Sequence, residues 1–298
     1  MSYEDTLKKL ALEDESIVVM TAENRAAIRN LPPHPGSRFI DVGIAEQTMI
    51  GAAAGLALRG RKPICHALAT FLCFRAYEFI RTDVGIGKLP VKLVGGVPGF
   101  LSDGNGPTHQ AIEDVALMRG IPGMQVYCPA DAWELETLLP VLFASDAPAY
   151  VRYNPSKPVV AHQTPIAPGK AEVLAEGRDV TLLTYGFLLE HVLAAKAELE
   201  KHKLSVGVVN VRSLKPVDEN AILKALAGSH VVVTIEDHFL TGGLYTIVAE
   251  TALKHGAHGK VFPIALEEKW FKPATLPAVL DFEGFTGPKL AERVLAAM

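Results

Sequence analysis

Short runs of Val, Ile and other apolar residues alternate with longer amphipathic segments along nearly the whole sequence of 298 residues. A short apolar run predicts a buried strand, and a longer amphipathic segment predicts a helix. Strands that alternate with helices pair in parallel, and the helices then cover both faces of the sheet. The alternation therefore predicts an α/β fold with three layers, in which mainly parallel sheets lie between layers of helices.

The expected elements fall into two sets, one in each half of the chain. The first set has strands at Ser16–Met20, Arg38–Val42, Pro63–Ala67, Val91–Val97, Gln125–Tyr127 and Ala149–Val151, and helices at 45–58, 70–88, 113–119 and 131–145. The second has strands at Val180–Tyr185, Ser205–Val211, Val231–Ile235 and Val261–Ile264, and helices near 188–202, 218–227, 244–255 and 288–297. The segment 266–287 is expected to be irregular. Thr70 and Asp131 are well placed as helix N-caps.

A Pro-rich stretch separates the two sets. It runs from Asn154 to Gly169 and has four prolines in sixteen residues, which disfavour both a helix and a central strand. A chain of this length can bury two cores. We therefore expect two consecutive α/β domains, at 1–155 and 171–298, joined by a linker at 156–170.

Composition and charge exclude several classes of protein. The net charge of −4, without a basic stripe, argues against a nucleic-acid partner. No segment reaches the ~20 uninterrupted apolar residues that a membrane-spanning helix needs. The cysteines Cys65, Cys73 and Cys128 are far apart, which argues against a disulfide framework or a zinc site and suits the reducing cytoplasm. The charged N-terminal segment does not have the pattern of a signal peptide.

Ligands of open parallel sheets bind at the carboxyl ends of the strands. Four features follow directly after expected strands of the first half, so they would share one edge of the sheet. These features are Glu46, the aromatic residues Phe71, Phe74 and Tyr77, the Gly-rich loop Gly99–His109, and Arg152. This edge is the candidate site.

Glu46 stands in the first turn of an expected helix. The helix dipole favours a carboxylate there whatever its function. The following Gly51-Ala-Ala-Ala-Gly55 segment gives the helix a face of small residues, against which a partner can pack closely. A carboxylate buried at such a contact is costly unless it is paired or has a function. Glu46 is therefore either a helix-stabilising residue or a functional group.

The aromatic residues leave two interpretations open. Phe71, Phe74 and Tyr77 are spaced at i, i+3 and i+6, which places them on one face of a helix. This face is either a stripe that packs into the core or a wall on which a flat heterocycle stacks.

The polar candidates also allow two interpretations each. His109, behind the flexible Ser102–Gly106 segment, is either a structural histidine or a proton-transfer group. Arg152 and Arg25 are either anion-binding residues or ordinary surface charges. The run Glu236-Asp-His238 in the second half resembles a metal-ligand set, but the glycines close behind it favour a tight turn into a helix.

Five motifs resemble those of the transketolase family. Three resemble its pyrimidine-binding domain: Val42-Gly-Ile-Ala-Glu-Gln47, Thr70-Phe-Leu-x-Phe-x-x-Tyr77 and Gly106-Pro-Thr-His-Gln110. Two resemble its C-terminal domain: Ser213-Leu-Lys-Pro-Val-Asp218 and Thr234-Ile-Glu-Asp-His-Phe-Leu-Thr-Gly-Gly243. The resemblance covers nearly the whole chain in order. It implies a thiamine-diphosphate-dependent transferase that moves a two-carbon ketol group from a ketose (phosphate) donor to an aldose (phosphate) acceptor.

The resemblance also assigns roles to residues. The glutamate matching Glu46 hydrogen-bonds the pyrimidine N1′ of thiamine diphosphate and so prepares the cofactor for deprotonation. The aromatic residues matching Phe71, Phe74 and Tyr77 surround the pyrimidine. The histidine matching His109 contacts a hydroxyl of the donor sugar and takes part in catalysis, and the arginine matching Arg152 binds the sugar phosphate. We expect Asn105 and Arg25 to contact substrate as well.

The resemblance further implies a partner subunit. Family members hold the diphosphate and Mg²⁺ (or Ca²⁺) with a Gly-Asp-Gly…Asn motif in an N-terminal domain, and these 298 residues contain no such motif. We therefore expect the chain to be the C-terminal subunit of a split transketolase, which completes its sites with an N-terminal subunit in an α2β2 assembly.

Two positions depart from the family pattern. Many transketolases have Asp where this chain has Asn105, and Val97 replaces a phosphate-binding His. Both departures put recognition of a sugar phosphate in doubt and allow an unusual or unphosphorylated sugar.

Three other interpretations remain. A 1-deoxyxylulose-5-phosphate synthase-like enzyme shares the Ile-Ala-Glu-Gln run, but that group has Arg where this chain has Pro98 and is normally one long chain. The β subunit of a 2-oxoacid dehydrogenase has similar size and domain order, but Gly106–Gln110, Phe74 and Tyr77 fit that group poorly. A non-catalytic paralogue would have no need to keep Glu46 and the aromatic residues.

Overall fold

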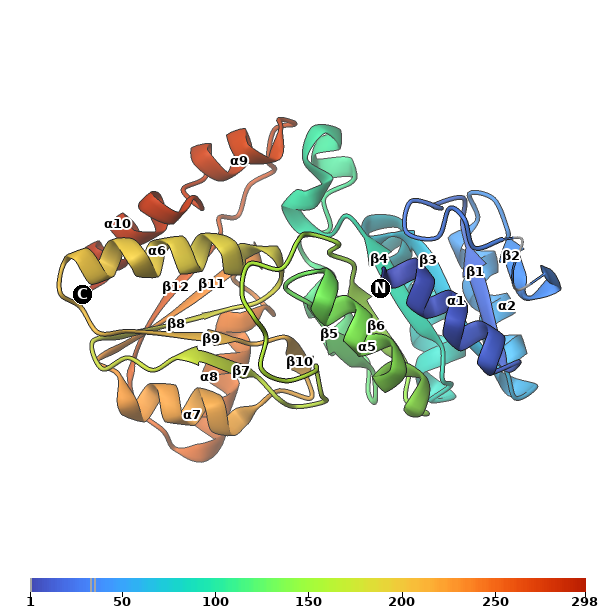
Figure 1. The fold of residues 1–298 in the computed structure, drawn as a ribbon, viewed down its shortest axis with the longest axis horizontal. Helices are drawn as coiled ribbons and strands as arrows, with labels where there is room; N and C mark the ends of the chain where they lie inside the picture. The colour runs from blue at the N-terminus through green and yellow to red at the C-terminus, as the bar shows by residue number, and fades with distance from the viewer. Residues whose placement is uncertain (1, 33, 35) are drawn as a thin grey trace.

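The computed structural model describes residues 2–32, 34 and 36–298 and contains two sheets side by side (Figure 1). The first sheet has the strand order β10-β5-β6-β4-β3-β1-β2. Its strands are β1 (Ile17–Thr21), β2 (Phe39–Asp41), β3 (Lys62–Leu68), β4 (Lys92–Gly96), β5 (Gln125–Tyr127), β6 (Ala149–Arg152) and β10 (Ser213–Lys215). All neighbours are parallel except β10, which pairs with β5 in the antiparallel direction.

The second sheet has the order β12-β11-β8-β9-β7. Its strands are β7 (Glu172–Ala175), β8 (Val180–Thr184), β9 (Val206–Asn210), β11 (Val231–Phe239) and β12 (Lys260–Leu266). Only β7, at one edge, is antiparallel to its neighbour. The predicted fold class, mainly parallel α/β, is therefore confirmed for both halves of the chain.

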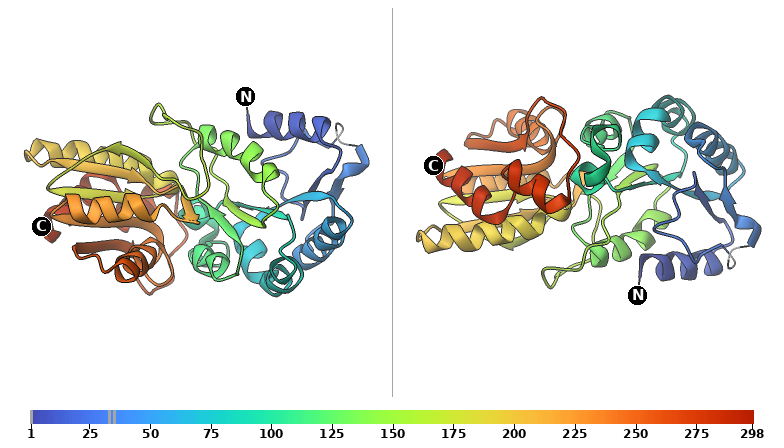
Figure 2. Two further views of the ribbon diagram at one scale, coloured as in Figure 1. Left: turned by 90° about the horizontal axis from the view of Figure 1, so that it is seen from below. Right: turned by 90° about the horizontal axis from the view of Figure 1, so that it is seen from above.

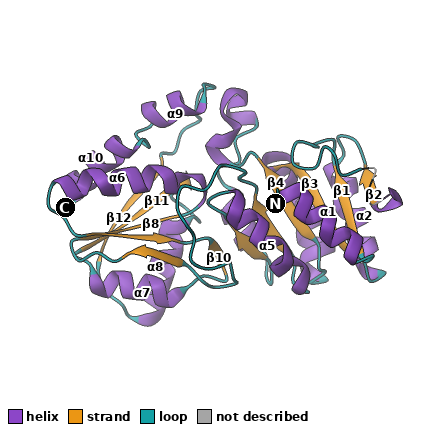
Figure 3. Cartoon of the chain, in the orientation of Figure 1, coloured by secondary structure: helices purple, strands orange, loops and turns teal. Residues whose placement is uncertain are grey.

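Helices cover both faces of the first sheet (Figures 2 and 3). One face carries α1 (Tyr3–Glu13) and α5 (Ala132–Ala144), whose leucines pack on apolar residues of the central strands. The other face carries α2 (Glu46–Leu58), α3 (Tyr77–Phe79) and α4 (Asp114–Arg119), which belong to a separate apolar cluster. Every position of β1 is buried because both faces of this strand are covered.

The second sheet is covered in the same way. On one face lie α6 (Leu189–Lys201), α9 (Leu276–Phe282) and α10 (Gly287–Ala297). The other face is covered by α7 (Glu219–Gly228) and α8 (Leu244–His255). The segment expected to be irregular, 266–287, therefore contains one short helix, α9. No described helix has both the length and the apolar character that crossing a bilayer requires.

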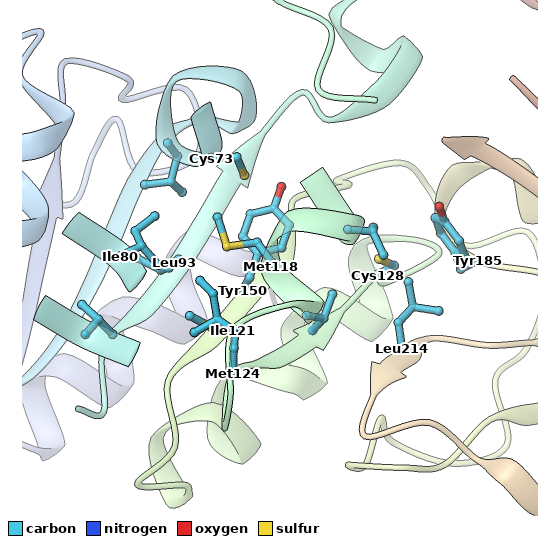
Figure 4. Close-up of a cluster of buried hydrophobic side chains, with 14 of the residues drawn as sticks. Cys73, Ile80, Leu93, Met118, Ile121, Met124, Cys128, Tyr150, Tyr185 and Leu214 are labelled. Atoms are coloured by element: carbon cyan, nitrogen blue, oxygen red, sulfur yellow. The ribbon is translucent and has the colours of Figure 1, made fainter. Parts of the chain in front are cut away.

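One apolar cluster continues from the first half into the second (Figure 4). It includes Met118 and Tyr150 beside the first sheet, and Tyr185 and Leu214 from the second half. The edge strand β10 also crosses this boundary. The sequence analysis did not predict β7 or β10, which are antiparallel edge strands defined by their pairing with other segments rather than by a local pattern. The two halves are consequently packed together along a shared core.

The expected helix at 70–88 is not one regular helix. Two π-helical segments, η2 (Phe71–Arg75) and η3 (Ile80–Ile86), flank the single turn α3. The predicted N-cap role of Thr70 is wrong, because its hydroxyl donates to the carbonyl oxygen of His109 and makes no cap hydrogen bond. The predicted cap at Asp131 is confirmed, since its carboxylate accepts from the first free amides of α5.

The loop predicted to be flexible adopts 3₁₀ turns. The segment η4 (Gly99–Thr108) contains two such stretches, interrupted at Ser102 and at Gly106. It follows the carboxyl end of β4 and lies beside α9 of the second half (Figure 1). His109 is the residue that ends η4.

Candidate active site

Three of the predicted residues are joined by a continuous series of contacts at the carboxyl edge of the first sheet. Arg75 Nη1 donates to Glu46 Oε2 at 2.7 Å. The guanidinium of Arg75 lies 4.3 Å from the centre of the Phe71 ring. The Phe71 ring in turn contacts the His109 imidazole edge-on, with ring centres 5.0 Å apart. Glu46, Phe71 and His109, from three different segments, therefore lie in one site.

Glu46 is the first residue of α2 and is only 2% exposed. Among the described residues, only Arg75 hydrogen-bonds its carboxylate, and Arg75 uses only Oε2. The side chain of Arg75 is 37% exposed, so it can move away without leaving a buried void. A buried carboxylate with an open oxygen can accept a hydrogen bond from a protonated ring nitrogen and stabilise its charge. Glu46 therefore fits the pyrimidine ring that the resemblance implies.

Arg75 was missed by the sequence analysis. The signal that would have found it is a lone cation inside the aromatic Thr70–Tyr77 run, four residues after Phe71. In a helical segment this spacing places the cation beside the ring and close to any carboxylate that faces it.

The three aromatic residues have different surroundings. Phe71 is half-buried between Arg75 and His109. Phe74 is 36% exposed. Tyr77 packs against the core, and its hydroxyl donates to the carbonyl oxygen of Leu117 at 3.3 Å. Tyr77 therefore packs into the core, as one of the two interpretations predicted. Phe71 and Phe74 keep part of their ring surface exposed at the carboxyl edge of the sheet.

His109 is held in place by its neighbours. Its Nδ1 is 2.8 Å from the hydroxyl of Thr108, and Thr70 hydrogen-bonds its backbone carbonyl. No described residue hydrogen-bonds its Nε2. The adjacent Gln110 is 1% exposed, yet neither of its side-chain polar atoms has a hydrogen-bond partner in the part of the chain that is described. Buried polar atoms of this kind normally find partners, so the site has unused hydrogen-bonding capacity.

The surroundings of Arg152 argue against its predicted role in substrate binding. Arg152 is 3% exposed, and four hydrogen bonds within this chain hold its guanidinium. It donates to both oxygens of Asp114 at 2.9 and 2.7 Å, to Asp237 at 2.6 Å and to the carbonyl oxygen of Ala111 at 3.1 Å. Burial alone would raise the pKa of Asp114, but the Arg152 guanidinium lowers it. With two carboxylates around one guanidinium, no charge remains to hold a phosphate.

The remaining substrate candidates lie at the surface. Arg25 is exposed, and its Nε donates to Asp41 Oδ2 at 2.9 Å. Asn105 is exposed within η4. Val97 has φ +46°, an unfavourable conformation for a β-branched residue, and with Asn24 and Tyr153 it lines a cavity of about 100 Å³. Backbone strain of this kind is concentrated at functional sites.

A second group of ionisable side chains ties the linker to both halves. His162 donates to Asp131 and to Glu172 at 2.6 Å each. Arg212 Nη1 donates to Glu134 at 2.9 Å and lies 3.5 Å from Glu172. Glu134, His162 and Glu172 have the spacing of a metal site. However, both imidazole nitrogens already bond carboxylates and Arg212 lies among them, so this arrangement is an ion-pair network.

This network should make stability depend on pH. Burial alone would lower the pKa of His162, but its bonds to Asp131 and Glu172 raise it to about 10. A pKa raised above the unfolded value of 6.5 means that the stabilisation is complete below pH 6.5 and is lost as pH approaches about 10. We expect the free energy of unfolding, measured with urea, to fall over this range, and His162→Gln to flatten the decline.

The matched control is His230→Gln, because the His230 side chain is 82% exposed. It should keep the pH dependence of the unaltered protein. A decline just as steep in His162→Gln would assign the pH dependence to other groups.

Comparison with known proteins identifies the family. Residues 1–157 match the pyrimidine-binding domain of transketolase, and residues 169–290 match the transketolase C-terminal domain. The chain belongs to the transketolase family. It is 38% identical over 253 residues to the 6-deoxy-6-sulfo-D-fructose transketolase subunit of Clostridium sp. (strain MSTE9), a match that covers 84% of this chain and 79% of that subunit.

Two further matches are a solved structure of about the same length as this chain and an enzyme more than twice as long. A solved structure described as a split gene transketolase, inactive beta4 tetramer, superposes with a TM-score of 0.90 and 33% identity, covering 99% of this chain and 96% of that one. The 1-deoxy-D-xylulose-5-phosphate synthase of Dictyoglomus thermophilum (strain ATCC 35947 / DSM 3960 / H-6-12) is 36% identical over 88% of this chain. Only 43% of that synthase is covered, so this chain spans less than half its length.

Proposed function

We propose that this chain is the C-terminal subunit of a two-chain, thiamine-diphosphate-dependent transketolase. The observation that carries the proposal is Glu46, a buried carboxylate with one open oxygen, which Arg75 connects to the half-buried Phe71 ring. When bound, thiamine diphosphate supplies the electron sink that allows a carbon–carbon bond of a ketose to break.

Glu46 would accept a hydrogen bond from the pyrimidine N1′ through its free oxygen. The apolar surroundings strengthen this bond, because a charged acceptor in a low-dielectric site stabilises a protonated ring nitrogen more than water does. Arg75 must leave the carboxylate or shift to its outer edge when the ring arrives. Phe71 and Phe74 would pack on the face of the heterocycle, each contributing about 0.5–1.5 kcal/mol beyond its buried area.

His109 would hydrogen-bond a donor hydroxyl through Nε2, the ring nitrogen that no described residue engages. Thr108 contacts the other ring nitrogen and so holds the ring orientation before substrate binds. Proton transfer by a positioned imidazole typically accelerates a reaction by about 10²–10⁴-fold. Asn105 and Gln110, on either side of His109, would add hydrogen bonds to the sugar.

The sugar substrate need not be phosphorylated. Arg152 is neutralised by Asp114 and Asp237, and Arg25 is paired with Asp41. Val97, where the family carries a phosphate-binding histidine, presents an aliphatic side chain. The Clostridium relative is named for a sugar with a sulfonate at carbon 6. This is consistent with a family whose substrates vary at the end of the sugar away from the carbonyl group. We therefore propose a ketose donor and an aldose acceptor. Arg152 does not bind the end of either sugar that lies away from the carbonyl group.

A partner subunit would cover the exposed apolar side chains of α2, the loop before it and the segments η2, α3 and η3. Large apolar side chains are exposed before α2, at its end, in α3 and in the π-helical segments: Ile44 69%, Leu58 72%, Phe74 36%, Phe79 36% and Ile86 72%. Exposed apolar side chains on neighbouring segments are a feature of interaction surfaces. The partner would bring the Gly-Asp-Gly…Asn motif, the diphosphate site and the Mg²⁺ or Ca²⁺ ion, in an α2β2 assembly. The free, buried cysteines suit a cytoplasmic enzyme.

The split site leads to a direct prediction. We expect this chain alone to bind thiamine diphosphate weakly and to show no ketol transfer, because its residues contact only the pyrimidine end of the cofactor. Mixed with the N-terminal subunit and Mg²⁺, it should transfer ketol groups between sugars. Calorimetric titration and a donor–acceptor activity screen measure both quantities. Tight, magnesium-dependent binding by this chain alone would contradict the proposal.

The second candidate is a 1-deoxyxylulose-5-phosphate synthase-like activity. It is favoured by the similarity to the Dictyoglomus synthase over most of this chain. Such an enzyme condenses a 2-oxoacid with an aldehyde and releases CO₂, whereas ketol transfer releases none. Measurement of CO₂ release by the reconstituted pair therefore separates the two activities.

A further inference from the structure

The loop that carries Asn105 and His109 is fastened to the second half of the chain. We propose that the C-terminal half, which contributes no catalytic residue, positions His109 by clamping η4 at two points, with Asp237 and Asp103 as positioning residues. This inference rests on the proposed function, since it concerns the placement of His109 for ketol transfer. It also gives a role to the Glu236–His238 segment.

The first point of the clamp is at the start of η4. Asp237, at the carboxyl end of β11, accepts a hydrogen bond from the backbone amide of Phe100 at 3.3 Å. Gly99 has φ +56°, and a Cβ there would lie 1.7 Å from Asp237 Oδ2. Only glycine allows so close an approach. The loop therefore leaves β4 in direct contact with the carboxylate of the other half.

The second point is near the tip of η4. Asp103 Oδ2 accepts from the amide of Leu276, the first residue of α9, at 2.8 Å. Pro273 packs so closely on Gly106 that a Cβ at Gly106 would lie 2.6 Å from its ring. Figure 1 and the right-hand view of Figure 2 show α9 beside η4. Gly106 lies three residues before His109, so this contact fixes the end of the loop that carries the imidazole.

Aromatic packing fills the space between the two points. The Phe100 ring is fully buried and meets Phe271 and Phe285 edge-on, with ring centres 5.1 and 6.1 Å apart. Both partners belong to the second half. Thr70 then holds the carbonyl of His109 from the side of the first sheet. The loop is thus held from both halves of the chain.

The two residues beside Asp237 also make contacts that hold this part of the chain in place. Glu236 accepts from the amides of Leu244 and Tyr245 at 2.5 and 2.9 Å, which satisfies the free amides at the start of α8. His238 Nε2 accepts from the amide of Ala116, in α4 of the first half, at 3.2 Å. The Glu-Asp-His run therefore joins the two halves and presents Asp237 to the loop.

Loop placement matters because catalysis by His109 depends on distance. A misplacement of 1 Å at a reacting group can cost about 10²-fold in rate. Loss of one clamp point, with the other retained, should cost less, and we expect about a tenfold fall in kcat. The affinity for thiamine diphosphate should not change, since neither Asp103 nor Asp237 lies near Glu46 in the series of contacts described above.

The experiment uses Asp103→Ala in the reconstituted two-chain enzyme. Asp103→Asn, which retains an acceptor oxygen, should recover most of the lost kcat. In a His109→Ala background, Asp103→Ala should have a much smaller effect, because most of its action passes through the imidazole. An equal loss in both backgrounds, or no loss in either, would overturn the proposal. Asp237→Asn is a second variant, whose folding is checked first by circular dichroism because Asp237 is buried.

The matched control is Glu250→Gln. It breaks another contact between the halves, the Arg119–Glu250 ion pair, which does not touch η4. It should leave kcat unchanged. Hydrogen exchange of the amides at 99–110 gives a readout that does not depend on activity: Asp103→Ala should accelerate it and Glu250→Gln should not. If the unaltered pair lacks ketol transfer, the proposed function fails, whereas unchanged exchange in Asp103→Ala refutes the clamp itself.

Discussion

Replacement of Glu46 by alanine in the assembled enzyme is expected to lower ketol transfer by about 10²–10⁴-fold, the range that a positioned acid–base group contributes. The carboxylate is buried, and its free oxygen is the group proposed to hold the protonated pyrimidine ring. Without it, the protonated form of the ring nitrogen loses the negative charge that stabilises it in a buried site. Assembly with the partner should remain intact, since alanine is a better helix former than glutamate.

The measurement compares kcat at saturating cofactor with the size of the complex in solution. Glu46→Gln retains the shape of the side chain and should be nearly as inactive, because an amide cannot supply the negative charge. The control is Glu78→Gln, an exposed carboxylate on the neighbouring turn α3. Near-normal turnover in Glu46→Ala would remove this residue from the mechanism.

The elements of the fold were predictable where the sequence signal is local and repeated. The buried strands β3 and β8 were found within a residue or so of their ends, because an apolar run between turn residues is a local pattern. The edge strand β10 was not, because its three residues are defined by a partner strand 86 positions earlier in the chain, as shown by the pairing of Ser213 with Tyr127. Pairing between distant segments leaves no periodic trace.

The same distinction between local signals and contacts of distant segments applies to the candidate site. The sheet rule brought Glu46, Phe71 and His109 to one edge, and the structure joins them through Arg75. Arg152 also lies at that edge, as expected, but its availability depends on Asp237, which is 85 residues away in the chain. A sequence shows where a charged residue stands along a strand. It does not show which distant carboxylate neutralises it.

Because of that burial, Arg152→Ala should affect stability far more than substrate affinity. Removal of the guanidinium leaves Asp114 and Asp237 buried without their partner. Breaking a buried ion pair on one side typically costs about 3–5 kcal/mol, most of it from the uncompensated charge. We expect the free energy of unfolding in urea to fall by about that amount.

The surface pair Lys201–Glu198 offers the control, because Lys201→Ala breaks an exposed ion pair that is worth at most about 1 kcal/mol. Arg152 and Asp114 belong to the first half and Asp237 to the second, so the alanine variant also loosens the contact that holds η4. Activity should therefore fall through kcat, with KM values for charged and uncharged sugars changing alike. A stable variant with a raised KM for anionic sugars alone would return Arg152 to the substrate site, since only a free guanidinium discriminates by charge.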